Sequence, residues 1–507
     1  MHTAPRPEPP KPASLEEAYR VIAQLFERVQ LAEWQIAQLK KQHFGPSADK
    51  VATAQENLSA EQGLLDVLAE PSPPPATAEV VLPETPAKSP SKRPARHPQP
   101  NVVETVVERI EPADRVCEHC GKPKCEIGCE KSERYEFVPA KLVRHQIVRP
   151  KYACPCGEGK VVIAPAAAVL IDKGLADASL VSQVVLAKYV DHIPLFRQQQ
   201  QFQRLGFNVA RTTLCGWVEK AAEWLQPIVR EMKRELLASD YLQVDETPVR
   251  VLDPEVQGKS AKGHLWVLGQ PGGDVIFEFH RGRGAEEARQ VLGSFRGYLQ
   301  RDGYASYATL ANAPNSGLVP CGCVAHGRRK FVEALLDEPE QARWVVEQIG
   351  KLYVIEAHAR SEGLRPEQRL KLRQELAPPI WEQIKVRLEE LRRSSILPQS
   401  PLGKAVRYAT NEWDAWQKYL QDGRLEMDNN LIENAIRPTA VGKKNYLFIG
   451  HPDAGWRSAV IYSVVVSCKR RNIEPWAYLK DVFTRLPAAK IQDIASFVPA
   501  RWKPATA

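Results

Sequence analysis

The sequence predicts a multidomain α+β protein, because strand-like and helix-like stretches occupy separate parts of a long chain. Strand patterns rich in Val, Tyr and Thr lie between residues 241 and 324, whereas helical patterns dominate residues 175 to 237 and 331 to 419. Six of the ten cysteines fall between Cys117 and Cys156, which indicates a metal-binding module in a reducing compartment. A chain of 507 residues is long enough for several domains.

Charge and hydropathy allow a nucleic-acid partner and argue against a membrane or secreted protein. The net charge of +8 is compatible with a polyanionic partner such as nucleic acid, although the 61 acidic residues mean that charge alone does not require one. No apolar run reaches the roughly 18 residues of a membrane span, and the amino terminus lacks the hydrophobic core of a signal peptide. We therefore expect a cytoplasmic protein that is not attached to a membrane.

The amino-terminal stretch from Leu15 to Leu39 carries apolar residues on a seven-residue repeat. Branched residues at the first seam position and Leu or Ala at the second predict a short coiled coil within residues 1 to 46, and hence a homo-oligomer. An amphipathic helix docked on the protein body is the alternative. Residues 47 to 100 lose the repeat and are crowded with prolines, which predicts an extended linker.

Two cysteine pairs predict a zinc ribbon within residues 101 to 165. Four thiolates can bind Zn²⁺ tetrahedrally, and the bound ion then holds a small module together. The expected ligands are Cys117, Cys120, Cys154 and Cys156. The wide gap and the one-residue spacing of the second pair depart from the usual form, so the alternatives for one ligand are Cys125, Cys129 and His119.

The region of residues 166 to 237 contains two helical patterns joined by a turn at Gly206. This order is that of a helix-turn-helix, whose second helix contacts bases through its first residues. Those residues here are Arg211, Thr212 and Thr213, while Gln198 to Gln201 on the first helix are candidates for the DNA backbone. Helix pairs joined by glycine are common, so a plain packing role is the alternative.

Three acidic residues stand at the ends of predicted elements. Asp245 lies in a strand from Tyr241 to Val251, Asp302 follows a second short apolar run, and Glu433 lies in the first turn of a helix. A carboxylate among apolar strand neighbours is costly to bury unpaired, so we expect a cation beside Asp245. Strand acid, strand acid and helix acid is the layout of a two-metal phosphoryl-transfer site.

Three other acids compete for these positions. Strand alternation places Glu246 on the face opposite Asp245, Asp253 lies beyond the strand, and Asp428 is better explained as the cap of the helix. Without metal the three selected carboxylates repel one another, so at least one carboxyl pKa should be raised.

The acids and their neighbours resemble those of bacterial DDE transposases of the insertion sequence 66 family. Besides the three acids, the resemblance rests on the stretch from Cys323 to Phe331, on Asp-Asn-Asn at residues 428 to 430, on Arg437 with Pro438, and on Gly-Lys-Lys-Asn at residues 442 to 445. These motifs are long, stand in the family's order and span most of the chain.

The resemblance implies a transposase that binds the terminal inverted repeats of its insertion sequence, cuts DNA at the 3′ ends and joins those ends to target DNA. It also implies two small accessory proteins as candidate partners and a bacterial cytoplasm, with action at the nucleoid, as the location. An inactive, transposase-derived repressor that only binds DNA is the alternative.

The order three strands, helix, strand, helix, strand between residues 241 and 324 suggests a ribonuclease H-like fold. The catalytic domain is expected at residues 238 to 450, with an all-helical insertion at about residues 332 to 420 before the third acid, as the resemblance implies. Residues 451 to 507 form a C-terminal helical region in this interpretation.

The expected chemistry needs divalent cations at the acids. We expect two Mg²⁺ ions, with Mn²⁺ as a substitute, Asp245 as the bridging ligand, and Asp302 and Glu433 each holding one ion. Cys323 and His326 are expected to support the acids unless Cys321 joins them as a metal ligand. Basic residues beside the acids are expected to contact DNA phosphates, namely Arg328, Arg329, Lys330, Arg437, Lys443 and Lys444.

Overall fold

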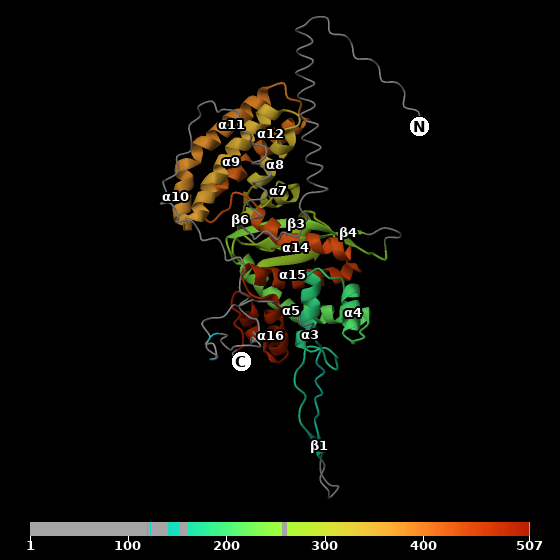
Figure 1. The fold of residues 1–507 in the computed structure, drawn as a ribbon. Coiled ribbons are helices and arrows are strands. Elements are labelled where there is room, and N and C mark those ends of the chain that lie inside the picture. Colours follow the sequence, from blue (N-terminus) through green and yellow to red (C-terminus); the bar gives the residue numbers. More distant parts are fainter. Residues whose placement is uncertain (1–118, 120–121, 123–139, 153–160, 256–260, 506–507) are drawn as a thin grey trace, which may run out of the picture. The chain divides into compact units, whose positions relative to one another are not determined.

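The computed structural model describes residues 119, 122, 140 to 152, 161 to 255 and 261 to 505 (Figure 1). The expected coiled coil, the proline-rich linker and the zinc ligands Cys117, Cys120, Cys154 and Cys156 lie outside this part of the chain. Two short strands, β1 (Lys151–Tyr152) and β2 (Val162–Ile163), pair antiparallel on either side of residues 153 to 160. Only flanking parts of the expected zinc module are therefore described.

The main sheet has five strands in the order β5, β4, β3, β6, β7, and its strands β3, β4 and β6 are labelled in Figure 1. Its members are the antiparallel strands β3 (Tyr241–Val251), β4 (Ala261–Gly269) and β5 (Val275–His280), and the strands β6 (Gly297–Gln300) and β7 (Leu318–Cys321), which extend the sheet in parallel from β3. The crossovers that parallel pairing requires contain the helices α6 (Ala285–Leu292) and α7 (Ala305–Ala311). The expected order of three strands, helix, strand, helix and strand is confirmed.

Strand β3 pairs with β6 only at its start, and on that same side its end meets Ile449 in a short parallel bridge. Its residues from Tyr241 to Gln243 pair with β6, whereas pairing with β4 continues to Val251. Pro248 lies beyond the reach of β6, and its carbonyl accepts a hydrogen bond from Lys443 instead of from β4. The missing N–H of Pro248 therefore costs no ladder hydrogen bond, which is why proline is tolerated in a central strand.

Helix α15 (Gly455–Arg470) covers the edge of the sheet at β5. The hydroxyls of Ser463 and Ser467, one helical turn apart, accept the backbone N–H groups of Phe277 and Val275 at 2.8 and 2.9 Å. Buried serines thus satisfy an edge that would otherwise be open to a further strand.

Three helices precede the sheet: α3 (Ala178–Tyr189), α4 (Leu195–Arg204) and α5 (Arg211–Leu237). The turn between α4 and α5 passes through Gly206 at φ 80°, a left-handed conformation that glycine adopts without strain. The expectation that Gln198 reaches DNA is wrong. This side chain is buried and donates to the carbonyls of Val184 and Ile193, so it holds α4 against α3.

Residues 324 to 420 contain helices and no strand. The helices are α8 (Val324–Ala334), α9 (Pro339–Ser361), α10 (Pro366–Leu376), α11 (Pro378–Arg393), α12 (Pro401–Asn411), α13 (Trp413–Trp416) and a 3₁₀ helix at Gln417–Leu420. Four of them begin with proline, whose fixed φ suits the first helical position. Helix α8 packs against α9 and α12, and α11 contacts both of these (Figure 1).

These helices meet the sheet through close contacts at glycine. The indole of Trp416 lies where a Cβ on Gly322 or Gly327 would clash with it, and the ring of Tyr408 occupies the same kind of space beside Gly303. A larger residue at Gly303 or Gly322 would push Tyr408 or Trp416 away from the ends of β6 and β7, and one at Gly327 would push Trp416 away from α8.

The chain ends in helical segments. They are α14 (Asn430–Tyr446), α15, α16 (Pro475–Arg485) and the 3₁₀ helices Pro452–Ala454, Leu486–Ala488 and Ile491–Phe497. Among the helices that the structure describes, none has both the length and the apolar composition needed to cross a membrane.

Candidate active site

Asp245 and Asp302 lie at corresponding places on two parallel strands. Gln243 of β3 is paired with Gln300 of β6, and each acid follows its member of this pair by two residues. Strand β6 ends at Gln300, so Asp302 stands in the loop at its carboxyl end, where its carboxylate accepts the backbone N–H of Tyr304 at 3.1 Å. The sheet register therefore brings together two acids that are far apart in the sequence.

Asn429 fixes the start of α14 beside Asp245. Its side-chain amide donates to the carbonyl of Val244 at 2.9 Å, and its backbone N–H donates to the thiol sulfur of Cys323 at 3.2 Å. Glu433 lies in the first turn of the same helix. One side chain thus ties the helix that carries the third acid to the strand that carries the first.

The electrostatics of Asp245 show that the three acids act on one another. Burial raises the pKa of Asp245 to about 8; the hydrogen bond from the Glu246 N–H opposes this rise, while the charges of Glu246, Asp302 and Glu433 add to it. The sequence led us to expect a raised carboxyl pKa from mutual repulsion of the acids; the pKa of Asp245 is raised, but burial is the main cause and repulsion is the smaller one. Within the described residues, no ion pair involves Asp245 or Asp302.

The competing acids have local roles. Glu246 accepts the Tyr307 hydroxyl at 2.7 Å on the face opposite Asp245, and burial raises its pKa. Asp253 lies beyond β3 and accepts the backbone N–H of Glu255. Asp428 accepts the backbone N–H of Asn430 just before α14, but the N-cap residue of this helix is Asn429, so the expected capping position is off by one residue. Glu246 nevertheless contributes negative charge to Asp245, which the alternation of side chains did not predict.

The acids fit a divalent cation by their chemistry. The charges of Asp302 and Glu433 act on Asp245, which is buried enough to resist ionisation, and no side-chain cation of the described residues forms an ion pair with it. Among the described residues, the three acids do not form a group of ligand atoms within 4.8 Å of one another, as Cys323, His326 and Glu433 do. Mg²⁺ prefers such oxygen ligands together with water and substrate oxygens. The cation expected beside Asp245 is thus not supplied by a described side chain, and the site can accept one from solution.

Lys443 lies beside the acids on the same face of β3. Its ammonium donates to the Thr247 hydroxyl at 2.8 Å and to the Pro248 carbonyl at 2.9 Å, and burial lowers its pKa. Thr247 is two residues beyond Asp245, so both side chains point toward α14. Lys443 was expected at DNA, and the structure ties it to the strand that carries Asp245.

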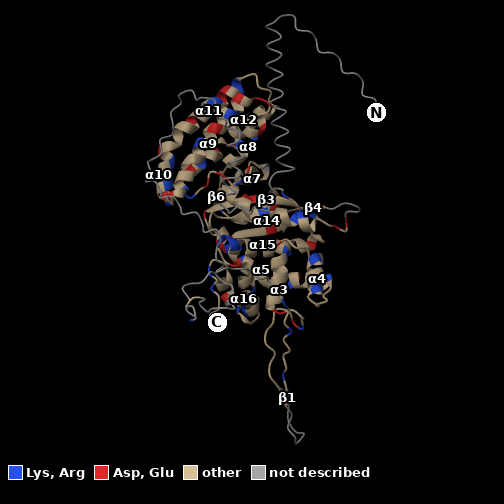
Figure 2. Cartoon of the chain, viewed as in Figure 1, with Lys and Arg blue, Asp and Glu red and all other residues tan. Residues whose placement is uncertain are grey.

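Lys and Arg are interspersed with Asp and Glu over the described elements (Figure 2). The other basic residues that were expected at DNA differ in their surroundings. Arg329 reaches Glu433 at 3.8 Å, Lys330 places its ammonium 4.9 Å from the centre of the Tyr408 ring, and burial lowers the pKa of Arg328. Arg437 and Lys444 on α14 have exposed side chains. At the start of α5, Arg211 and Thr212 are exposed and Thr213 is half-buried.

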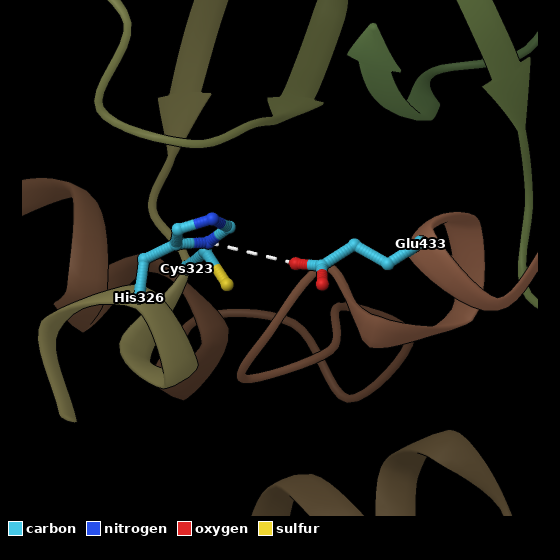
Figure 3. A group of neighbouring side chains, drawn as sticks. All are labelled: Cys323, His326 and Glu433. Carbon is cyan, nitrogen blue, oxygen red and sulfur yellow. Dashed lines mark ion pairs between the residues drawn. The ribbon is translucent and has the colours of Figure 1, made fainter. Parts of the chain in front are cut away.

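Cys323 and His326 lie next to Glu433 (Figure 3). Nδ1 of His326 is 3.6 Å from Oε1 of Glu433, and the buried thiol of Cys323 completes a group whose ligand atoms all lie within 4.8 Å of one another. Cys321 does not join them, because its thiol points to the Val319 carbonyl. The spacing of Cys323 and His326 was visible in the sequence, but the contribution of Glu433 was not.

Comparison with known proteins supports the resemblance. The family model described as "Transposase IS66 family" matches residues 173–457, "zinc-finger binding domain of transposase IS66" matches residues 114–157, and "IS66 C-terminal element" matches residues 463–500. Similar curated proteins come from Sinorhizobium fredii and are named as uncharacterized proteins. The protein y4jD is 34% identical, with 78% of this chain and 79% of the relative covered. The protein y4qI is 33% identical, with 79% and 76% covered. The chain therefore belongs to the transposase IS66 family.

Proposed function

We propose that this chain is an active transposase that binds the terminal inverted repeats of its insertion sequence, cleaves DNA at the 3′ ends and transfers those ends to target DNA. The observation that carries the proposal is the buried Asp245, whose pKa is raised to about 8 by burial and by the charges of Glu246, Asp302 and Glu433, and which has no ion-pair partner among the described residues. Such uncompensated carboxylates are costly to keep unless they bind a cation.

The sheet supports a ribonuclease H-like assignment for this domain. Three antiparallel strands are followed by two parallel ones; Asp245 lies within β3, and Asp302 follows the adjacent parallel strand β6. The helices of residues 324 to 420 lie between the second and the third acid in the sequence. This arrangement supports an all-helical insertion in a catalytic domain.

Asp245, Asp302 and Glu433 are the residues that would hold Mg²⁺ or Mn²⁺. Bound divalent ions would stabilise the negative charge that develops on the phosphoryl oxygens. In cleavage, the oxygen of water bonds to phosphorus and the bond to the 3′ oxygen breaks, which leaves a 3′ hydroxyl. In transfer, that hydroxyl attacks a target phosphodiester, and the bond between the target phosphorus and its 3′ oxygen breaks.

The contacts to DNA belong to the same proposal. Arg211, Thr212 and Thr213 at the start of α5 would face bases. The basic residues around the acids would hold the phosphate backbone, and the zinc-finger segment at residues 114–157 would add a second contact. Oligomerisation through residues 15 to 39 and help from accessory proteins also remain part of the proposal.

Strand transfer by the purified chain tests the activity. The substrate is a duplex that ends in the terminal repeat of the element, with Mg²⁺ or with EDTA. We expect joining only with Mg²⁺ and a loss of roughly 100-fold or more in Asp245→Asn, Asp302→Asn and Glu433→Gln, because each change removes charge from the developing transition state. Asp253→Asn, beyond the end of β3, is the matched control and should join normally.

Joining that survives the change of one acid removes that residue from the site. Wild-type protein that binds the repeat but never cuts or joins, with the accessory proteins present, would contradict the proposal and favour a DNA-binding repressor.

A further inference from the structure

We propose that Cys323, His326 and Glu433 form a second metal site, specific for a thiophilic divalent ion of the zinc class, and that an ion bound there withdraws Glu433 from the other two acids. The metal site rests on the geometry of the three side chains. Its inhibitory effect rests on the proposed function, in which Glu433 serves the catalytic cation.

The distance between His326 and Glu433 fits a shared metal better than a hydrogen bond. Nδ1 of His326 and Oε1 of Glu433 are 3.6 Å apart, and both are buried atoms without a hydrogen-bond partner in the described structure. A direct hydrogen bond would bring them to about 2.7–3.2 Å. Two ligands at about 2.0–2.1 Å from one tetrahedral Zn²⁺ are roughly 3.4 Å apart.

The thiol of Cys323 supplies the soft ligand. Cys323 is fully buried directly before α8, and His326 lies in the first turn of that helix, so the two side chains reach the same side (Figure 3). The Asn429 N–H bonded to the sulfur brings the start of α14, and with it Glu433, toward the thiol. The three ligand atoms within 4.8 Å of one another need only a small closure to surround an ion.

The neighbouring charge does not block this site. Arg329 places a guanidinium nitrogen 3.8 Å from Oε2 of Glu433, but its side chain is 57% exposed and can turn into solvent when a cation arrives. The side chains of His326 and Glu433 are each about one quarter exposed, which leaves a direction from which the ion and a fourth ligand such as water can enter.

The ligand chemistry separates this site from the catalytic one. Thiolate and imidazole select Zn²⁺ or Co²⁺, whereas Mg²⁺ prefers an oxygen environment. Glu433 is common to both sets. A zinc-class ion on Cys323 and His326 would therefore engage the carboxylate that the catalytic cation requires, and the two metals would act against each other.

Metal content of the full-length chain tests the site without any activity. The protein is equilibrated with excess Co²⁺, freed of unbound ion and analysed for bound metal and for thiolate-to-cobalt absorption. The zinc-finger segment would bind an ion of its own, so the informative quantity is the difference in metal content between wild type and variants. We expect Cys323→Ser and His326→Gln each to lose about one ion per chain.

The matched control is Cys321→Ser, a buried cysteine two residues away whose thiol lies outside the group. It should keep the metal content of wild type. Equal metal content in wild type and His326→Gln overturns the site. If Cys323→Ser does not fold, His326→Gln decides alone, because His326 is only half-buried.

Zinc inhibition tests the antagonism. Strand transfer at saturating Mg²⁺ is titrated with Zn²⁺, and each variant is compared with its own zinc-free rate. We expect the half-inhibitory Zn²⁺ concentration to rise roughly 10-fold or more in His326→Gln and to stay unchanged in Cys321→Ser. Equal inhibition in wild type and His326→Gln overturns the antagonism. If no strand transfer occurs at all, the proposed function fails, and the metal content still decides whether the site exists.

Discussion

Two buried carboxylates, Glu356 in the helices and Asp245 in the sheet, experience opposite surroundings. Burial alone would raise the pKa of Glu356, but hydrogen bonds and charge from Arg373 and Arg369 outweigh it and hold the pKa below its ordinary value. Burial raises the pKa of Asp245 to about 8, and the nearby charges that add to this rise are negative. Arginines of the helices thus neutralise Glu356, whereas no described side chain in the sheet neutralises Asp245. The charge of Asp245 is left for an external cation. Burial of an acid alone therefore does not point to a functional site, whereas burial without a counter-charge makes the acid a candidate for one.

The two regions are joined by one segment. Arg369 pairs with Glu356 and also with Glu426, which lies just before α14. The backbone carbonyl of Glu426 accepts the side-chain amide of Gln300, and its N–H donates to the hydroxyl of Tyr241. The self-neutralised network of the helices thus ends on the first residues of β3 and the last residue of β6, next to the acids. Its rigidity supports the position of α14 and Glu433.

The largest effect is expected from breaking the neutralised pair. Arg373 is fully buried and donates to both carboxylate oxygens of Glu356 and to the carbonyls of Tyr419 and Leu425. Arg373→Met should lower the free energy of unfolding by about 3–5 kcal/mol, because Glu356 stays charged and loses its main partner. Denaturant unfolding measures this loss.

The control is Arg393→Met at the end of α11, where the side chain is 77% exposed and pairs with Glu389 at 3.5 Å. It should change the stability by less than about 0.5 kcal/mol. A loss below about 1 kcal/mol in Arg373→Met would remove the contrast between the two regions.

A substitution at Asp245 is expected to change the free energy of unfolding in the opposite direction. Asp245→Asn removes a charge that the metal-free protein keeps at a cost, so it should stabilise that protein by roughly 1–3 kcal/mol above pH 8 while strand transfer is lost. Unfolding in EDTA measures the gain, and Asp453→Asn, whose side chain is 84% exposed, is the control. A destabilised Asp245→Asn variant would show that a counter-charge for Asp245 exists after all.

The titration of Asp245 is expected to make a smaller change in the free energy of unfolding for each pH unit. Its folded-state pKa of about 8 lies above the ordinary value of 3.8, so the folded protein binds the extra proton between these values. Stability from this group is present below about pH 4 and is lost as pH rises to about 8, by at most about 1.4 kcal/mol per pH unit. The difference in melting temperature between wild type and Asp245→Asn, followed against pH in EDTA, should change sign or slope in this window.

Repeating the melting-temperature measurement with Mg²⁺ in place of EDTA tests whether Asp245 binds the ion. The cation binds the ionised carboxylate, so the Mg²⁺-induced rise in melting temperature should grow with pH across the window in wild type and stay flat in Asp245→Asn. A rise that is independent of pH in wild type would show that Asp245 does not bind the ion.

The sequence could predict elements whose signals are local. The strand around Asp245, the order of the following strands and helices, and the start of a helix just after Asp428 follow from residue types and spacing within a few positions. The contrast described above depends on distant partners. Arg373 bonds Glu356 across 17 residues and Leu425 across 52, and the sequence shows only charged helices there.

The same limit explains what was missed at the site. Asn429 meets the Val244 carbonyl across 185 residues, and Lys443 meets Thr247 across 196. The sequence predicted that Gln198 is exposed. The side chain is instead buried, because its amide can donate to two nearby backbone carbonyls. Asparagine, lysine and glutamine are common on surfaces, so their types carry no signal until the fold supplies the partner.

The smallest change in the free energy of unfolding is expected from weakening the contact of Glu246. This acid is intermediate between Glu356, which is neutralised, and Asp245, which is not. Its side chain is only 3% exposed; burial raises its pKa, and the Tyr307 hydroxyl at 2.7 Å opposes that rise. Arg283, the nearest described cation, is 4.0 Å away and half exposed, so it cannot neutralise Glu246 as Arg373 neutralises Glu356. Tyr307→Phe should therefore cost about 1–2 kcal/mol in denaturant unfolding near neutral pH.

Tyr304→Phe separates the hydroxyl from the ring. Tyr304 contacts Tyr307 and Arg283 through its ring, and its hydroxyl has no hydrogen-bond partner among the described residues, so this change should be nearly neutral. If Tyr307→Phe costs as much as Arg373→Met, the hydroxyl is the main counterpart of Glu246, and this acid belongs with the self-neutralised network. If Tyr307→Phe lowers the free energy of unfolding only slightly, the charge of Glu246 is mostly uncompensated. Glu246 then favours, together with Asp245, the binding of an external cation.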